Sequence, residues 1–319
     1  MRGSSLDSLM NIIDVIMSAG KTSVDVALYT LIPVMVVMLI VMKYLEAKGV
    51  VDAVVRLTAP VLKPFGISGI AIFALIQLNF VSFAAPIAAL AIMEKRGTSE
   101  RQLAAALAML FAMGQGNVFY PLIPYGLHWG NAIIISILGG LAAAAVTYHL
   151  FGMKLSNAVQ NAAPADAFND KSSSSLIGII NGAGADAIRL ALGSLPMLLL
   201  SLTIVGILKE AGAIDVLTRL LSPMMAYFSL PEVYVLPTLT KCLAGGTAYF
   251  GVMSELLRKG LVTPEQMNAS AGFLIQTFDL PGIGIYLGIA SRFVRLFRYV
   301  IPGVIVGIAV RSIIHTLLY

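Results

Sequence analysis

The sequence predicts an all-α polytopic membrane protein made of two inverted repeats, and three observations lead to this fold class. Of the 319 residues, 58% are hydrophobic and only 12% are charged, whereas soluble domains carry roughly 25% charged residues. Apolar residues form blocks such as 24–42 and 130–152, each near the length that crosses a bilayer as a helix. Glycines, prolines and charged residues of the first half also recur, in order, in the second half.

The chain is expected to open with an N-terminal amphipathic segment, residues 1–23. Within it, residues 5–20 have the pattern of a helix at the membrane interface. A first spanning helix is then expected over about 24–45. Residues 50–63 combine helical spacing with charges and a proline, which is typical of a helix lying along the membrane surface.

The rest of the first half contains interrupted apolar blocks. The block 68–97 is broken by Asn79, Ser82 and Pro86, so it suits a pair of short helices better than one regular helix. A helix at 101–125 is broken by the letters GQGN, and an uninterrupted helix follows at 130–152. The first repeat is therefore expected to cover residues 24–152.

Residues 153–187 form the one long polar stretch and are expected to be a linker. The second repeat then covers residues 188–319, at a constant offset of 163 positions from the first. The two basic–basic–glycine runs that end at Gly97 and Gly260 continue this series. The matched pairs before them are Pro33 and Pro196, Gly49 and Gly212, Asp52 and Asp215, Arg56 and Arg219, Leu57 and Leu220, Pro60 and Pro223, and Phe65 and Phe228.

Charge counting decides whether the interrupted blocks 68–97 and 231–260 cross the membrane, because basic residues gather on the cytoplasmic side. If both blocks cross, nine basic residues face eight and no bias results. If both are re-entrant hairpins, each half crosses three times, the second repeat is inverted, and thirteen basic residues share one side. These are Lys43, Lys48, Arg56, Lys63, Lys95, Arg96, Arg101, Lys154, Lys171, Arg189, Arg292, Arg295 and Arg298, against Lys209, Arg219, Arg258 and Lys259. We therefore predict re-entrant hairpins.

Four breaks in the apolar blocks supply the candidate binding residues, because irregular backbone at membrane depth must be buried in protein or face water. Inverted-repeat transporters place their substrate where such breaks meet. Taken singly, each polar side chain at a break is explained by hydrogen bonding between helices; together they indicate a site. The predicted solute-binding residues are Gln77, Asn79, Ser82, Gln115, Asn117, Thr240, Lys241, Gly245, Gly246, Thr247 and Gln276.

Two charged residues, Lys241 and Asp279, lie inside these apolar segments. A charge at the bilayer centre costs about 2.5–3.5 kcal/mol on insertion scales, so it normally faces a cavity or a partner. One interpretation is a structural ion pair between the two residues. The other makes Lys241 a contact for an anionic solute and Asp279 a site that couples transport to protons or another cation. The sequence leaves both open.

Two segments carry a family resemblance. The run LNFVSFAAPIAALAIMEKRG, residues 78–97, resembles spore maturation protein A, and TLTKCLAGGTAYFGVMSELL, residues 238–257, resembles spore maturation protein B. Both belong to the nucleoside-recognition, or Gate, membrane proteins, so the chain resembles a fusion of the two. Distant similarity to concentrative nucleoside transporters implies inverted repeats with one hairpin entering from each side. Those transporters use glutamates in their broken helices, whereas here only Asp279 is acidic, which argues against a nucleoside.

The resulting hypothesis is a secondary transporter or exporter of a small polar, anionic organic solute that works by alternating access. The alternatives are a nucleoside transporter and a non-transporting membrane assembly or regulatory component. No cofactor is expected beyond a coupling H⁺ or Na⁺, and no arrangement of catalytic or metal-ligating residues favours an enzyme. The expected location is the cell (inner) membrane. Basic residues flank apolar blocks, so the net charge of +5 does not indicate nucleic acid; a homo-oligomer stays open.

Overall fold

The first three helices show how the protein begins. In the computed structural model, residues 2–158, 175–213, 216, 219–220 and 231–319 are described. Helix α1 (Arg2–Val24), a π-helical stretch η1 (Asp25–Leu31) and α2 (Ile32–Ala47) follow one another without a break. The interfacial helix expected at 5–20 and the span expected at 24–45 thus lie in one continuous helical run. The hydroxyl of Ser23 bonds the Ala19 carbonyl within the helix (2.7 Å), so this polar position does not interrupt it.

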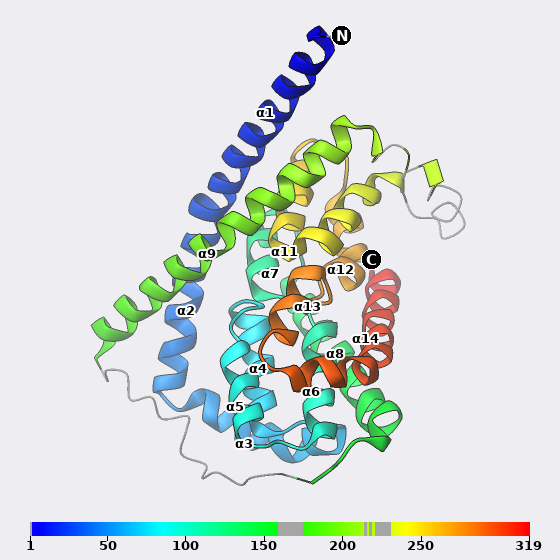
Figure 1. The fold of residues 1–319 in the computed structure, drawn as a ribbon. Coiled ribbons are helices and arrows are strands. Elements are labelled where there is room, and N and C mark those ends of the chain that lie inside the picture. The colour runs from blue at the N-terminus through cyan, green and yellow to red at the C-terminus, as the bar shows by residue number, and fades with distance from the viewer. Residues whose placement is uncertain (1, 159–174, 214–215, 217–218, 221–230) are drawn as a thin grey trace.

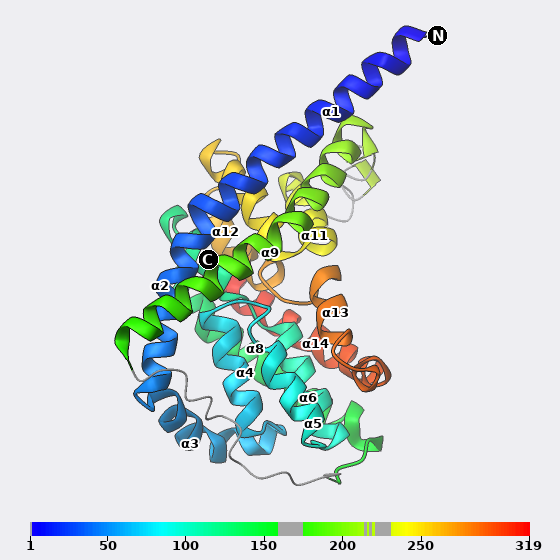
Figure 2. The ribbon, with the colours of Figure 1, turned by 60° about the vertical axis from the view of Figure 1, so that its left-hand side comes forward.

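Helix α9 (Leu176–Glu210) packs along α1 and α2. The three helices lie together on one side of the molecule, and the N-terminal end of α1 projects beyond the rest (Figures 1 and 2). Because α9 begins at Leu176, the linker predicted for 153–187 ends earlier than expected. Residues 159–174 of that linker lie outside the described residues, as do most of the matched positions in 214–230.

The first interrupted block forms two short helices, α4 (Gly69–Phe80) and α5 (Ile87–Lys95). Before them, α3 (Val50–Leu62) and the 3₁₀ turn η2 (Lys63–Phe65) meet α4 at an angle of 106°. Ser68 caps α4 by accepting a hydrogen bond from the Ala71 amide. Helices α4 and α5 pack against each other, as the two arms of a hairpin do.

The rest of the first half is a broken helix and a long one. Helix α6 (Glu100–Ala112) and helix α7 (Gly116–Leu122) are separated by extended backbone at Met113 and Gln115. The 3₁₀ turn η3 (Ile123–Tyr125) leads to α8 (Trp129–His149) and to the turn η4 (Phe151–Lys154). The predicted break at GQGN is thus confirmed.

The described part of the second half also contains an interrupted hairpin helix and a broken helix. After the 3₁₀ turn η6 (Glu232–Tyr234), α11 (Val235–Arg258) is interrupted at Gly245, whose φ of 84° is not helical. Helix α12 (Pro264–Leu274) and helix α13 (Leu280–Leu287) form the second broken helix, and α14 (Ser291–Leu318) ends the chain. Within the described residues, five helical stretches are long and apolar enough to span a membrane: Asn11–Ala47, Glu100–Tyr125, Trp129–His149, Leu176–Gly193 and Ser291–Leu318.

Contacts at the two ends of the bundle give the chain directions. At one end, here the first side, Arg292 of α14 bonds Glu94 of α5 and lies 4.0 Å from Glu100 of α6. At the opposite end, the second side, Asn268 of α12 donates to the Gly126 carbonyl after η3 (2.8 Å). The broken helix α6–α7 therefore runs from the first side to the second, and α12–α13 runs the other way.

The same contacts show that the α4–α5 hairpin does not cross. Before α4, the carbonyl of Pro64 lies 2.7 Å from His149 Nε2, at the first-side end of α8. After α5, Glu94 meets Arg292 on that same side. Both ends of the hairpin are on the first side, as the charge count predicts. The full inverted repeat remains a prediction, because part of the second half lies outside the described residues.

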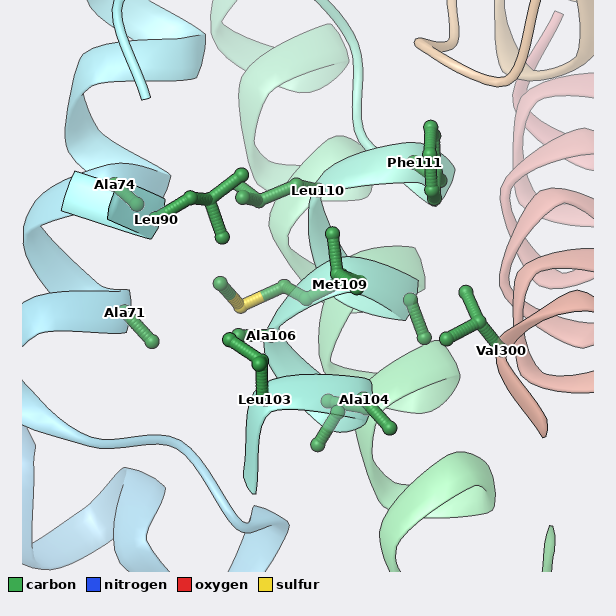
Figure 3. Close-up of a cluster of buried hydrophobic side chains, with 14 of the residues drawn as sticks. Ala71, Ala74, Leu90, Leu103, Ala104, Ala106, Met109, Leu110, Phe111 and Val300 are labelled. Carbon is green, nitrogen blue, oxygen red and sulfur yellow. The ribbon is translucent and has the colours of Figure 1, made fainter. Parts of the chain in front are cut away.

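Helix α6 is the centre of one hydrophobic core. Its buried residues run without interruption from Leu103 to Ala112. Figure 3 shows Leu110 facing Leu90 of the hairpin and Leu103 on the side of Ala71, while Val300 of α14 lies on the other side. Short alanine side chains on α6 allow this close approach, since small residues are what let membrane helices pack tightly. The core thus holds the start of the first broken helix rigidly.

Candidate functional site

The two helix breaks cross each other and are tied by direct hydrogen bonds. The Thr277 amide donates to the Phe111 carbonyl (3.1 Å) and the Thr277 hydroxyl donates to the Met113 carbonyl (2.9 Å). In return, Gln115 Nε2 donates to the Gln276 carbonyl (3.0 Å). These bonds satisfy backbone groups that helix breaks leave unpaired. We call the region around residues 113–117 and 275–279 the junction.

A buried arginine supports both breaks from behind. Arg311 of α14 is fully buried and donates to Ala112 at the end of α6 (2.6 Å) and to Ile275 after α12 (2.6 Å). A Cβ at Gly139 would lie 2.2 Å from Arg311 Cγ, so only glycine leaves room for this side chain. Positive charge at the C-terminal ends of two helices is electrostatically favourable. The guanidinium therefore stays inside the protein and does not extend to the membrane surface.

The first tip, residues 77–82, contacts the start of α7. A Cβ at Gly116 would lie 2.7 Å from the Asn79 carbonyl oxygen, so glycine there allows the tip backbone to touch α7. Asn79 itself donates to the Leu75 carbonyl (3.0 Å). Just beyond this tip, the Phe83 carbonyl accepts from Tyr286 of α13 (2.8 Å). The first tip is therefore held by both broken helices.

The second tip, residues 240–247, approaches the junction from α11. Gly245 adopts a left-handed φ of 84°, which glycine tolerates readily. A Cβ at Gly246 would lie 2.6 Å from Gln115 Oε1. Asn117 Nδ2 also donates to the Thr247 hydroxyl (3.3 Å). The glycine pair thus lets the second tip rest on the first broken helix.

Lys241 and Asp279 form an ion pair inside the molecule. Their side chains are only 1% and 3% exposed. Asp279 also caps α13, since its Oδ1 accepts from the Gly282 amide (2.7 Å) while its Oδ2 faces Lys241. The pair therefore links the second tip to the second broken helix. Of the two interpretations left open by the sequence, the ion pair is present.

Several polar atoms at the junction are buried and have no hydrogen-bond partner among the described residues. Such orphaned atoms are rare in native proteins, because each loses its hydration without compensation. Apart from the two hydroxyls of Ser82 and Thr240, the orphans at the predicted site residues are amide oxygens. They belong to Gln77, Asn79, Gln115, Asn117 and Gln276.

All four sequence breaks thus meet in one region, and the predicted site residues are spread over its two tips and two helix breaks. Sequence reasoning missed Thr277 and Tyr286, which hold the breaks and the first tip, and it did not place Arg311 behind them. Arg311 carried a usable signal, an arginine amid apolar residues. Among the described residues, no group of three or more His, Cys, Asp and Glu side chains is placed to hold a metal ion.

Comparison with known proteins agrees with this geometry. Residues 28–125 match the family model Gate, described as "Nucleoside recognition". No curated protein sequence matches the chain. The chain is similar in structure to CNTnw, a concentrative nucleoside transporter, in an inward-facing substrate-bound state. That match has a TM-score of 0.64 at 16% identity and covers 99% of this chain and 84% of the other.

Two CNTnw variants give similar values. One, in an outward-facing state, has a TM-score of 0.68 at 16% identity and covers 99% of this chain and 86% of its own. Another, in the intermediate 2 state, has a TM-score of 0.65 at 17% identity and covers 100% and 88%. Identities of this size establish the fold. The chain is an all-α multi-pass membrane protein with the fold of these transporters and resembles the Gate proteins.

Proposed function

We propose that this protein is a secondary transporter of a small polar, anionic organic solute, which binds at the junction between the two hairpin tips. The supporting observation is the set of orphaned, buried polar atoms at this one place. A solute that hydrogen-bonds these atoms satisfies them and is bound specifically, because an ill-matched solute leaves them unpaired.

The arrangement of the two tips supports alternating access. The first tip belongs to a hairpin rooted on the first side, while the second half of α11 leads to α12, which begins on the second side. Each tip rests on the α6–α7 break from its own hairpin. A cleft of about 490 Å³ lies behind α11, between it and helices α1 and α9. A movement of α11 into this space is the opening that the proposal requires.

In this proposal Lys241 recognises the negative charge of the solute, and Asp279 couples solute transport to protons or another cation. Lys241 supplies a buried positive group at the second tip, and Arg311 adds a second one behind the junction. A nucleoside is the second candidate, favoured by the amide oxygens, which accept hydrogen bonds from sugar hydroxyls and base amines, and by the family description of residues 28–125.

Uptake into proteoliposomes tests the proposal. Wild-type protein should take up members of a panel of carboxylates, phosphates and nucleosides, and Lys241→Ala and Asp279→Asn should each reduce this uptake. Lys259→Ala is the matched control, because Lys259 is an exposed lysine that pairs with Glu255 on the surface of α11. A protein that neither transports nor is stabilised by any panel member would instead be a membrane scaffold or regulatory component.

A further inference from the structure

The Lys241–Asp279 pair has an electrostatic consequence for transport. Both side chains are buried, and breaking such a pair strongly disfavours the state that holds one unpaired charge. An anion that binds Lys241 must displace the Asp279 carboxylate. That carboxylate then becomes a buried charge without its partner, unless it takes up a proton.

From this, resting on the proposed function, we infer that the pair is an exchange device that couples one proton to one anionic group. In the unloaded state the ammonium of Lys241 neutralises the carboxylate of Asp279. In the loaded state the ammonium is paired with the anionic group of the solute, and Asp279 Oδ2 carries the proton. The net charge of the buried site is the same in both states. A proton alone or an anion alone leaves one unpaired charge, so the two must move together.

The geometry of Asp279 suits this exchange. Its two carboxylate oxygens have different partners, because Oδ1 accepts from the Gly282 amide and Oδ2 meets Lys241. Protonation at Oδ2 therefore removes the ion pair and keeps the helix cap. A Cβ at Gly245 would lie 3.6 Å from Oδ2, so the backbone of the second tip lies directly beside the proton-accepting atom.

Other titratable and polar groups of the described residues also lie around the pair. Among the titratable groups, Cys242 of α11 and Tyr286 of α13 interact electrostatically with Asp279, and neither is charged near neutral pH at its ordinary pKa. The polar side chains that α4, α6 and α7 bring to the junction include Asn79, Gln115 and Asn117, which do not titrate. Arg311 donates to the Ile275 carbonyl at the junction and carries a positive charge at neutral pH.

The test measures affinity against pH with matched pairs of probes. Each pair has one anion and one neutral analogue: gluconate and sorbitol, uridine 5′-monophosphate and uridine, succinate and succinamide. Isothermal titration calorimetry of the purified full-length protein in buffers of different ionisation enthalpy reports proton uptake. In wild type, anions should bind with uptake of about one proton, and their apparent Kd should rise about tenfold per pH unit.

Two variants separate the exchange from simple structural effects. Asp279→Asn keeps the helix cap and mimics the protonated acid, so its anion affinity should be higher than in wild type and independent of pH. The variant Lys241→Met with Asp279→Asn removes both charges and should lose the preference for anions. Asp52→Asn, which changes an exposed acid on α3, should behave as wild type.

The outcomes distinguish the two proposals. If the neutral members bind wild type as well as the anions, or if anion binding is independent of pH, the exchange is wrong while a transporter of polar solutes stands. If no probe binds or is transported by wild type, the proposed function fails and the exchange fails with it. Proton uptake is measured on wild type, so poor folding of a variant leaves this test intact.

Discussion

The two hairpin tips reach the same junction with different chemistry. At the predicted offset of 163 positions, Lys241 and Asp279 of the second half correspond to Leu78 and Gly116 of the first. Leu78 is fully buried in the core, and Gly116 touches the first tip through its backbone. The first tip is therefore joined to the broken helices by close backbone packing and neutral hydrogen bonds, and the second by an ion pair.

This difference indicates a division of labour between the halves. Close packing of the first tip cannot respond to a proton, whereas an ion pair can, because protonation of a carboxylate removes its charge. If this comparison is right, changes at the second tip should alter charge balance and pH response. Equivalent changes at the first tip should alter packing or neutral solute contacts and leave the pH response unchanged.

The largest expected effect comes from breaking the ion pair. Lys241→Met leaves the Asp279 carboxylate buried without a partner and should lower the free energy of unfolding by about 3–5 kcal/mol. The counterpart Leu78→Met should lower it by less than about 1.5 kcal/mol. Chemical unfolding in lipid nanodiscs measures both. Removing both charges together should recover most of the lost stability. Equal losses in Lys241→Met and Leu78→Met would contradict the claim that the two tips are held by different interactions.

A smaller loss of stability is expected from a substitution at Gly116, the first-half counterpart of Asp279. Gly116→Ala places a methyl group 2.7 Å from the Asn79 carbonyl oxygen and should cost about 1–3 kcal/mol by overpacking. Gly284→Ala in α13 is the control, because nothing lies within 4 Å of a Cβ there. The same unfolding measurement applies. A Gly116→Ala protein as stable as the control would show that the first tip does not rest on α7.

The bond that joins the two breaks should contribute less. Thr277→Val removes the hydroxyl that donates to the Met113 carbonyl and should lower stability by about 0.5–1.5 kcal/mol. Thr58→Val is the control, because the Thr58 hydroxyl bonds only carbonyls of its own helix, those of Val54 and Val55. A loss no greater than that of the control would mean that the breaks are held by their backbone bonds.

The smallest change in stability is expected at Ser82, whose buried hydroxyl has no partner among the described residues. Ser82→Ala removes no internal bond, so unfolding should change by less than about 0.5 kcal/mol. If the solute bonds this hydroxyl, its Kd should rise roughly threefold to tenfold. Titration of a bound probe measures this. A stability loss without any change in Kd would assign Ser82 to the fold rather than to the site.

Much of this arrangement follows from the sequence. Apolar blocks, and the polar or glycine positions that interrupt them, predicted the helices and all four breaks, because lipid permits irregular backbone only in special places. The run from Arg2 to Ala47 was not predicted as continuous. Its first part is amphipathic and its second part is apolar, so the sequence suggests two separate helices. The structure shows one continuous helical run that packs against α9.

The sequence predicted which charged residues belong to the candidate site, but not which atoms they bond. The charges of Lys241 and Asp279 were conspicuous in apolar segments, but whether they meet depends on how α11 lies against α13. Thr277 and Tyr286 resemble ordinary helix residues in sequence, and their bonds to the Met113 and Phe83 carbonyls exist only once distant segments cross. The periodicity of apolar residues indicates which face of a helix is buried. It does not indicate which backbone atom a side chain on that face will bond.

The position of Arg311 has a consequence for biosynthesis. It lies in α14, which follows α6 and α12 in the chain, yet it bonds carbonyls at the ends of both. Both earlier helices leave the ribosome before α14, so the carbonyls at their ends must wait for α14 before Arg311 can satisfy them. The junction is therefore incomplete until α14 has been inserted, and a protein that lacks α14 would keep these carbonyls without their arginine.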